Sequence, residues 1–205
     1  MNRGYKNMDP KLNGRTDDEL VLLFKSGSGA AFEELVYRYK NSLYQYIMTM
    51  VQDEGAAGDL FQEVFISLFK NADKYEPRGK FKSWLFLTAR NRVLNFFRDR
   101  DKVSSLDQTD EAGNAFLHET LADGETSLLD GLAGRETEEE IRRASLELPQ
   151  RQREMIYLRQ YMSFKEIAEL LNRPLGTVLA DCHRAVKKMQ RILAAQEEAA
   201  REGML

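Results

Sequence analysis

The sequence predicts an all-α protein with two small helical domains joined by a flexible acidic linker, the second of them a helix-turn-helix domain. Apolar residues recur at spacings of three and four along most of the chain, which is the period of an α-helix. A length of 205 residues allows two domains of under about 100 residues each. A hydrophobic fraction of 42% is enough to form a core in each of them.

Charge divides the chain in the same way. Residues 70–102 include ten basic and four acidic side chains, residues 103–141 include one and eleven, and residues 151–192 include nine and four. One basic segment lies on each side of an acidic segment, and this pattern suggests two protein surfaces that face a polyanion. Ordinary solvated helix faces are the plainer interpretation, and charge alone leaves both open.

The first domain is predicted over 16–102, after a disordered N-terminus at 1–15. Thr16 and Glu19 form a capping box, which opens a short helix that ends near Gly27. A long helix follows and is expected to break at Gly55-Ala-Ala-Gly58. Its inner side is formed by Phe32, Leu35, Val36, Tyr39, Leu43, Tyr46, Ile47 and Met50.

Two more helices complete the first domain. The third is expected over 59–72, and its inner residues are Leu60, Phe61, Val64, Phe65, Leu68 and Phe69. Pro77 and Gly79 predict a loop over 75–80. The fourth helix then runs from Phe81 to about Arg100, with Trp84, Leu85, Ala89, Val93 and Phe97 turned inward.

Residues 103–134 are expected to be the linker, because their high acidity and low hydrophobicity give too little burial to offset the entropy of ordering. The second domain is predicted over 135–195 and a C-terminal tail over 196–205. Ser163 and Glu166 form another capping box, Asn172 ends that helix, and Thr177 is expected to cap the last one. This helix-turn-helix pattern also occurs in proteins that bind no DNA.

Several stretches now resemble one known family. They are Ala31-Phe-Glu-Glu-Leu-Val-Tyr-Arg-Tyr39, Gly58-Asp-Leu-Phe-Gln-Glu-Val-Phe65, Phe81-Lys-Ser-Trp-Leu-Phe-Leu-Thr-Ala-Arg-Asn91, Leu148-Pro-Gln-Arg-Gln-Arg-Glu154, Phe164-Lys-Glu-Ile-Ala-Glu-Leu-Leu171 and Gly176-Thr-Val178. In this order and at this spacing they resemble the extracytoplasmic-function (ECF) sigma factors of bacterial RNA polymerase. The resemblance runs from about Thr16 to Leu193.

The resemblance implies a cytoplasmic protein that binds bacterial core RNA polymerase, directs it to specific promoters and assists promoter melting. It makes the bundle sigma region 2 and the helix-turn-helix domain sigma region 4. Contacts with the clamp helices of the beta-prime subunit, and with the beta subunit, are implied. In region 2 the polymerase-binding residues would be Asp59, Gln62, Glu63 and Phe65.

Two DNA contacts are also implied. Melting needs aromatic platforms or pockets beside cations, and the expected minus-ten residues are Tyr75, Arg78, Lys80, Lys82, Arg90, Asn91, Arg92, Arg98 and Arg100. Phe81 and Trp84 fit the core better than a base platform, because they fall on the apolar spacing. The expected minus-thirty-five residues are Thr177, Leu179, Ala180, Asp181, His183, Arg184, Lys187 and Lys188.

The recognition segment departs from the family pattern. Where the family usually has a cation, a small hydroxyl residue and another cation, this chain has Leu179, Ala180 and Asp181. Arginine bidentate to guanine is the commonest direct base contact, and this segment has none to offer. We therefore expect an unusual or weakly specified minus-thirty-five sequence.

Enzymatic and metal chemistry find little support. One cysteine, Cys182, and two histidines exclude a disulfide within the chain and a multi-cysteine zinc site, and no cofactor is expected. No membrane insertion is expected either. An anti-sigma factor is an expected partner by family resemblance. Two other functions stay open: a stand-alone helix-turn-helix regulator, and a polymerase-binding decoy or interaction module that does not read promoters.

Overall fold

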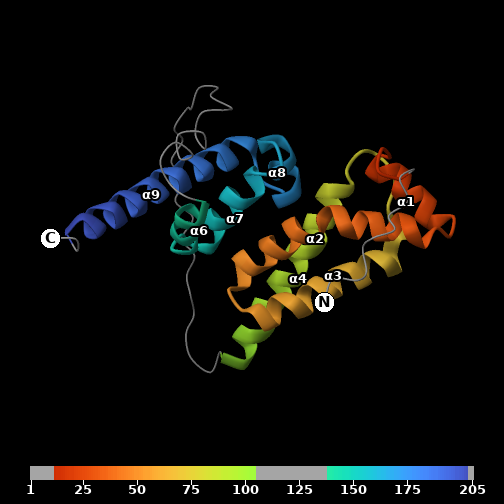
Figure 1. The fold of residues 1–205 in the computed structure, drawn as a ribbon, viewed down its shortest axis with the longest axis horizontal. Helices are drawn as coiled ribbons and strands as arrows, with labels where there is room; N and C mark the ends of the chain where they lie inside the picture. The colour runs from red at the N-terminus through yellow and green to blue at the C-terminus, as the bar shows by residue number, and fades with distance from the viewer. Residues whose placement is uncertain (1–11, 105–137, 203–205) are drawn as a thin grey trace. The chain divides into compact units, whose positions relative to one another are not determined.

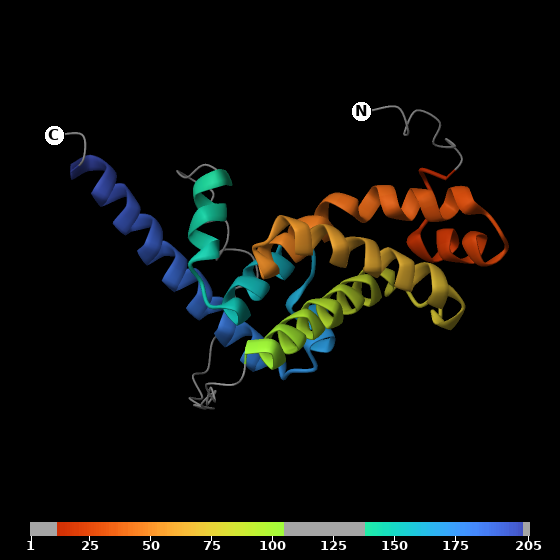
Figure 2. The same ribbon diagram turned by 90° about the horizontal axis from the view of Figure 1, so that it is seen from below.

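The computed structural model describes residues 12–104 and 138–202, and all regular structure within them is helical (Figures 1 and 2). The chain divides into two compact units, residues 1–108 and 109–205. The predicted all-α class is confirmed. Most of the expected linker and of the expected disordered N-terminus lies outside the described residues. Among the helices that are described, none has the length and apolar character needed to cross a lipid bilayer.

The first unit is built around its second helix. Its elements are α1 (Asp17–Lys25), α2 (Gly29–Val51), α3 (Glu54–Asn71), the 3-10 turn η1 (Ala72–Lys74) and α4 (Phe81–Ser104). α2 packs against α1, α3 and α4. The expected inner side of α2 is largely confirmed, with Leu35, Leu43, Tyr46, Ile47 and Met50 all buried.

The predicted Thr16–Glu19 capping box is confirmed. The break between α2 and α3 was expected at Gly55-Ala-Ala-Gly58, and this position is wrong. The backbone turns at Gln52, whose φ is 55°, and Asp53 caps α3 by accepting a hydrogen bond from the Ala56 amide at 2.8 Å. Gly55 and Gly58 therefore lie inside α3. A side-chain cap combined with a left-handed residue ends one helix and starts the next without a glycine.

Phe69 also departs from its expected inward position. Its side chain is 59% exposed, although its ring still lies 5.2 Å from that of Phe24 and 5.5 Å from that of Phe32. Phe65 is half-buried between Phe61 and Phe32. The apolar residues of α3 cover a wider part of the helix surface than the part that packs against α2. The aromatic side chains at the edge of this apolar surface therefore reach the solvent.

Arg38 ties α2 to the start of the chain. Its guanidinium donates to Glu34 at 2.8 Å and to Asp17 at 3.1 Å, and also to the carbonyls of Leu12, Asn13 and Arg15. Glu34 is only 3% exposed, so its carboxylate depends on this cation for charge compensation. One side chain thus fixes the approach to α1.

The second unit contains α6 (Glu138–Leu146), α7 (Gln150–Arg159), α8 (Phe164–Leu171) and α9 (Leu175–Glu202). α9 packs against the other three helices through Val178, Cys182, Ala185, Val186, Met189 and Leu193. The Ser163–Glu166 capping box is present, and Asn172 ends α8 with a φ of 51°. The predicted helix-turn-helix is therefore confirmed as α8, its turn and α9.

The start expected for the last helix is wrong, and the helix continues into the segment expected as a tail. α9 starts at Leu175 rather than after a Thr177 cap, because the Thr177 and Val178 amides already donate to the Pro174 carbonyl. At the other end it runs on to Glu202, through most of the segment expected as a tail. Figures 1 and 2 both show α9 extending past the helices that pack against it.

Replacing Arg38 tests the tie at the start of the chain. Arg38→Ala is expected to lower the free energy of unfolding of the first unit by about 3 kcal/mol, because it leaves the buried Glu34 carboxylate without its cation. Urea unfolding followed by tryptophan fluorescence isolates this unit, since Trp84 is the single tryptophan. Arg15→Ala, which breaks an exposed pair with Glu19, is the control and should leave the midpoint unchanged. Equal midpoints for the two variants would contradict the role given to Arg38.

Candidate nucleic-acid interface

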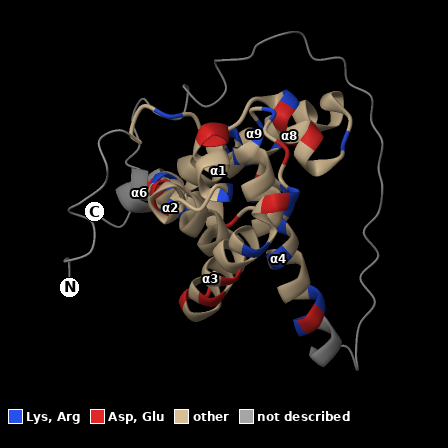
Figure 3. Ribbon diagram, turned by 90° about the vertical axis from the view of Figure 1, so that its right-hand side faces the viewer, with Lys and Arg blue, Asp and Glu red and all other residues tan. Residues whose placement is uncertain are grey.

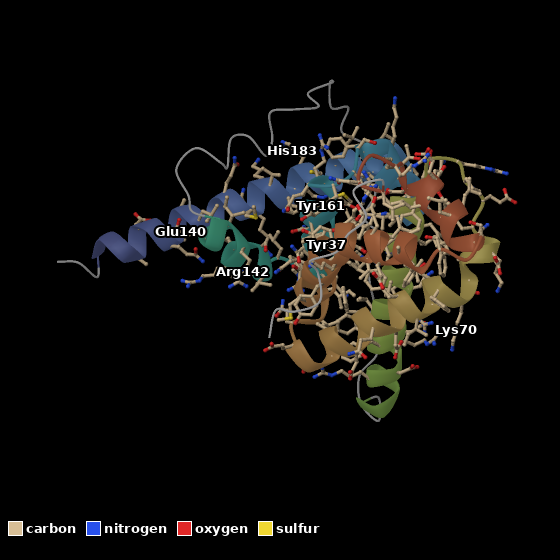
Figure 4. All side chains as sticks on the ribbon, turned by 45° about the vertical axis from the view of Figure 1, so that its right-hand side comes forward. Tyr37, Lys70, Glu140, Arg142, Tyr161 and His183 are labelled. Carbon is tan, nitrogen blue, oxygen red and sulfur yellow. The ribbon has the colours of Figure 1, made fainter. Side chains whose placement is uncertain are left out.

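The outer side of α3 is polar and exposed. Asp59, Gln62 and Glu63 are all exposed there, while Phe65 is half-buried at the edge. Figure 4 shows Lys70 projecting from the far end of the same helix. The structure thus brings Asp59, Gln62 and Glu63 onto the outer side of α3, whereas Phe65 lies toward the aromatic cluster with Phe61 and Phe32.

The loop that joins η1 to α4, residues 75–80, is called the reading loop below. Its residues Glu76 to Lys80 are exposed, and Arg78 pairs with Glu76. Gly79 has a φ of 69°, a left-handed conformation that glycine adopts without strain. The exposed loop offers cations on a backbone with little regular structure.

Tyr75 does not fit its expected role as an exposed base platform. The side chain is 5% exposed and packs with Trp84 and Phe81, at ring distances of 5.1 and 5.8 Å. Its hydroxyl donates to Asp18 at 2.6 Å. Burial, together with the adjacent carboxylate, raises the pKa of Tyr75, so the hydroxyl stays protonated and keeps donating at neutral pH. Tyr75 is therefore a support for the reading loop.

Cations recur along α4, as the blue segments in Figure 3 show. Asn91, Arg98 and Arg100 are exposed, whereas Lys82, Arg90 and Arg92 are half-buried. Arg92 lies 3.4 Å from Glu63 of α3, which joins the basic helix to the acidic one by an exposed and therefore weak ion pair. Trp84 is half-buried, and Phe81 is a core residue as expected.

In the second unit the expected DNA-contacting residues lie on α9 and are exposed to different degrees. Thr177, Leu179, Ala180 and His183 are partly exposed, and Arg184, Lys187 and Lys188 are exposed. Figure 4 labels His183 on α9. The three exposed cations, with Arg191, line one side of a groove of about 670 Å³, which Glu147 and Gln152 also line. The basic side chains therefore follow one stripe of the helix.

Asp181 is held between two arginines. Its carboxylate accepts from Arg184 at 2.5 Å and pairs with Arg173 at 2.6 Å, and its side chain is 16% exposed. Arg173 belongs to the turn before α9 and was not among the expected site residues. The sequence carries no local signal for this contact, because the arginine stands eight positions before the aspartate and across a helix boundary. The two cations offset the charge that would otherwise repel phosphates.

Cys182 lies on the buried side of α9 itself. Its side chain has no exposed surface, and burial raises the pKa of the thiol to about 11. Within residues 12–104 and 138–202, no three His, Cys, Asp or Glu side chains gather in a way that could hold a metal ion.

Comparison with known families places both units in one class. Residues 35–103 match the model of sigma-70 region 2, and residues 138–189 match that of sigma-70 region 4. Together they cover more than half of the 205 residues. The fold and its surfaces thus define a sigma-70 type transcription initiation factor.

Individual relatives narrow this class. The chain is 31% identical to the ECF RNA polymerase sigma factor SigW of Bacillus subtilis over 173 residues, which cover 82% of this chain and 92% of the relative. It is 28% identical over 179 residues to the ECF RNA polymerase sigma-E factor of Escherichia coli, covering 83% and 90%. The chain belongs to the family of ECF RNA polymerase sigma factors, which confirms the resemblance seen in its sequence.

A solved structure supports the fold. The sigma factor RpoE of Bartonella quintana, crystallised with the anti-sigma factor NepR, matches with a TM-score of 0.61 and 21% identity. The match covers 80% of this chain and 96% of that one.

The reactivity of the Cys182 thiol tests how tightly the buried side of α9 is packed. At pH 8 a pKa of about 11 leaves about one thiol in a thousand ionised, so iodoacetamide should label the native chain far more slowly than the chain unfolded in urea. Mass spectrometry of the single cysteine measures both rates. Native labelling as fast as that of the unfolded chain would contradict the burial of Cys182.

Proposed function

We propose that this sigma factor binds bacterial core RNA polymerase with the outer side of α3, captures the minus-ten element with the reading loop and α4, and contacts the minus-thirty-five element with α9. Residues 16–102 would act as region 2 and residues 135–195 as region 4. The observation that carries the proposal is the pairing of two sigma-70 regions with exposed surfaces of suitable chemistry in each.

The polymerase contact follows from the chemistry of α3. Exposed carboxylates at Asp59 and Glu63, with the amide of Gln62, suit a partner surface that carries arginines. Phe65 adds apolar area at the rim, where aromatic residues are effective anchors. The proposed partners are the clamp helices of the beta-prime subunit, together with the beta subunit.

The minus-ten contact combines a loop with a basic helix. Arg78 and Lys80 stand on the exposed reading loop, and Asn91 presents an amide on α4. Lys82, Arg90, Arg92, Arg98 and Arg100 would hold the phosphates of the separated strand. Because Tyr75 is buried, base capture would depend on the loop backbone and its neighbouring cations rather than on that ring.

The minus-thirty-five contact would be mostly electrostatic. Leu179 and Ala180 can touch thymine methyl groups, and Thr177 can donate to a phosphate. His183, Arg184, Lys187 and Lys188 would supply backbone affinity along one side of α9. With Asp181 held by two arginines, the segment has few groups for reading bases directly.

The remaining assignments follow from the family. Sigma factors are transcription initiation factors, so polymerisation chemistry would belong to the polymerase and not to this chain. The structural match to a sigma factor bound to an anti-sigma factor supports a similar partner here. Because bacterial RNA polymerase acts in the cytoplasm, a sigma factor that binds it would also be cytoplasmic.

Run-off transcription on fragmented genomic DNA tests the proposal. Bacterial core polymerase is used with and without the full chain, and the RNA starts are sequenced. Starts that depend on the chain and share a motif about ten bases upstream are expected. Core binding without new starts would favour a decoy, and duplex binding by a symmetric dimer without polymerase would favour a stand-alone regulator.

Asp181→Asn tests the minus-thirty-five surface. Loss of one negative charge beside the phosphates should strengthen nonspecific duplex binding by the holoenzyme and steepen the plot of log affinity against log salt by about 1. Fluorescence anisotropy at several salt concentrations measures both. Glu198→Gln makes the same charge change 17 residues further along α9, about 25 Å away, and should have little effect. Equal shifts in the two variants would contradict the placement of Asp181 at DNA.

A further inference from the structure

Two side chains of α1 form hydrogen bonds with the reading loop and the residues just before it. Asp18 accepts a hydrogen bond from the Tyr75 hydroxyl at 2.6 Å through Oδ1, and one from the Gly79 amide at 2.6 Å through Oδ2. Lys25 donates from Nζ to the Asp73 carbonyl at 3.2 Å and to the Tyr75 carbonyl at 2.6 Å. Both carboxylate oxygens of Asp18 are therefore used on the loop.

The spacing of the two residues matches the span of the loop. Asp18 and Lys25 are seven positions apart, so they share one side of α1 about 10 Å from each other. Lys25 holds the segment where η1 ends, and Asp18 holds Gly79 just before α4 begins. Figure 1 shows the connection between α3 and α4 passing beside α1. The loop is thus fixed near both of its ends.

These contacts act on a part of the chain that has no helix or strand. Glu76 to Lys80 are exposed and form neither helix nor strand, and Gly79 has wide conformational freedom. A loop that is ordered before it binds loses less conformational entropy on binding. Hydrogen bonds to charged groups are the stronger ones, and all four contacts here involve an ionised partner.

We infer that Asp18 and Lys25 are positioning residues that hold the reading loop in the conformation that captures minus-ten bases, an inference that rests on the proposed function. Neither residue belongs to the segments matched by the sigma-70 region models, which begin at residue 35. α1 would therefore contribute to promoter opening and minus-ten selectivity without touching DNA.

The test uses full-length Asp18→Ala with core polymerase and a promoter from the run-off experiment. Opening of that promoter is expected to fall about tenfold, as loss of charge-assisted hydrogen bonds at a binding loop predicts. Discrimination between the preferred minus-ten sequence and single-base variants should fall as well, while core binding stays unchanged. Asp18→Asn keeps one acceptor oxygen and should be intermediate. Hydrogen exchange at the Gly79 amide, measured without polymerase or DNA, should accelerate in Asp18→Ala.

Asp17→Ala is the matched control. Asp17 also accepts from a tyrosine hydroxyl, that of Tyr39, and from Arg38, but its recorded contacts are with α2 and not with the loop. Unchanged exchange at Gly79 would overturn the inference whatever the function. Rapid exchange, with opening and discrimination equal to those of Asp17→Ala, would overturn it as well and leave the sigma function intact. Failure of the wild-type chain to open any promoter would overturn the proposed function, and the inference with it.

Discussion

The burial of α2 determines which sides of α1, α3 and α4 are exposed to solvent in the first unit. α1, α3 and α4 all pack against this helix, whose Leu43, Tyr46 and Ile47 have no exposed surface. Each surrounding helix must turn an apolar side toward it. The opposite sides are left for function: carboxylates on α3 and cations on α4. The two proposed surfaces are consequently set by one core.

Two adjacent carboxylates on α1 have different structural partners. Asp17 turns toward Arg38 and Tyr39 on α2, and Asp18, the next residue, turns toward Tyr75 and Gly79. A helix rotates about 100° per residue, so adjacent side chains face different neighbours. The same residue type therefore holds the core at one position and a surface loop at the next.

Much of the fold could be predicted from local patterns. The capping boxes at Thr16 and Ser163 and the ending at Asn172 were correct, because each depends on residues within a few positions. The predicted start of α3 is wrong because glycine is tolerated inside a helix, and the Asp53 cap after a left-handed Gln52 separates the two helices instead. α9 continues into the segment expected as a tail because a polar, alanine-rich segment can extend a helix without a buried side.

The site was harder to predict than the fold. The family motifs predicted which helices carry the candidate surfaces, but the position of Tyr75 depends on an acceptor 57 residues away, and Asp181 depends on an arginine across a turn. Neither contact follows from helical spacing.

The unbroken length of α9 has a mechanical consequence. Its 28 residues span about 42 Å, with the helix-turn-helix at one end. Leu193 is the last buried residue of α9, and the described side chains after it are exposed. The last turns are therefore held by backbone hydrogen bonds and not by a core, so they can unwind and re-form without disturbing the helix-turn-helix.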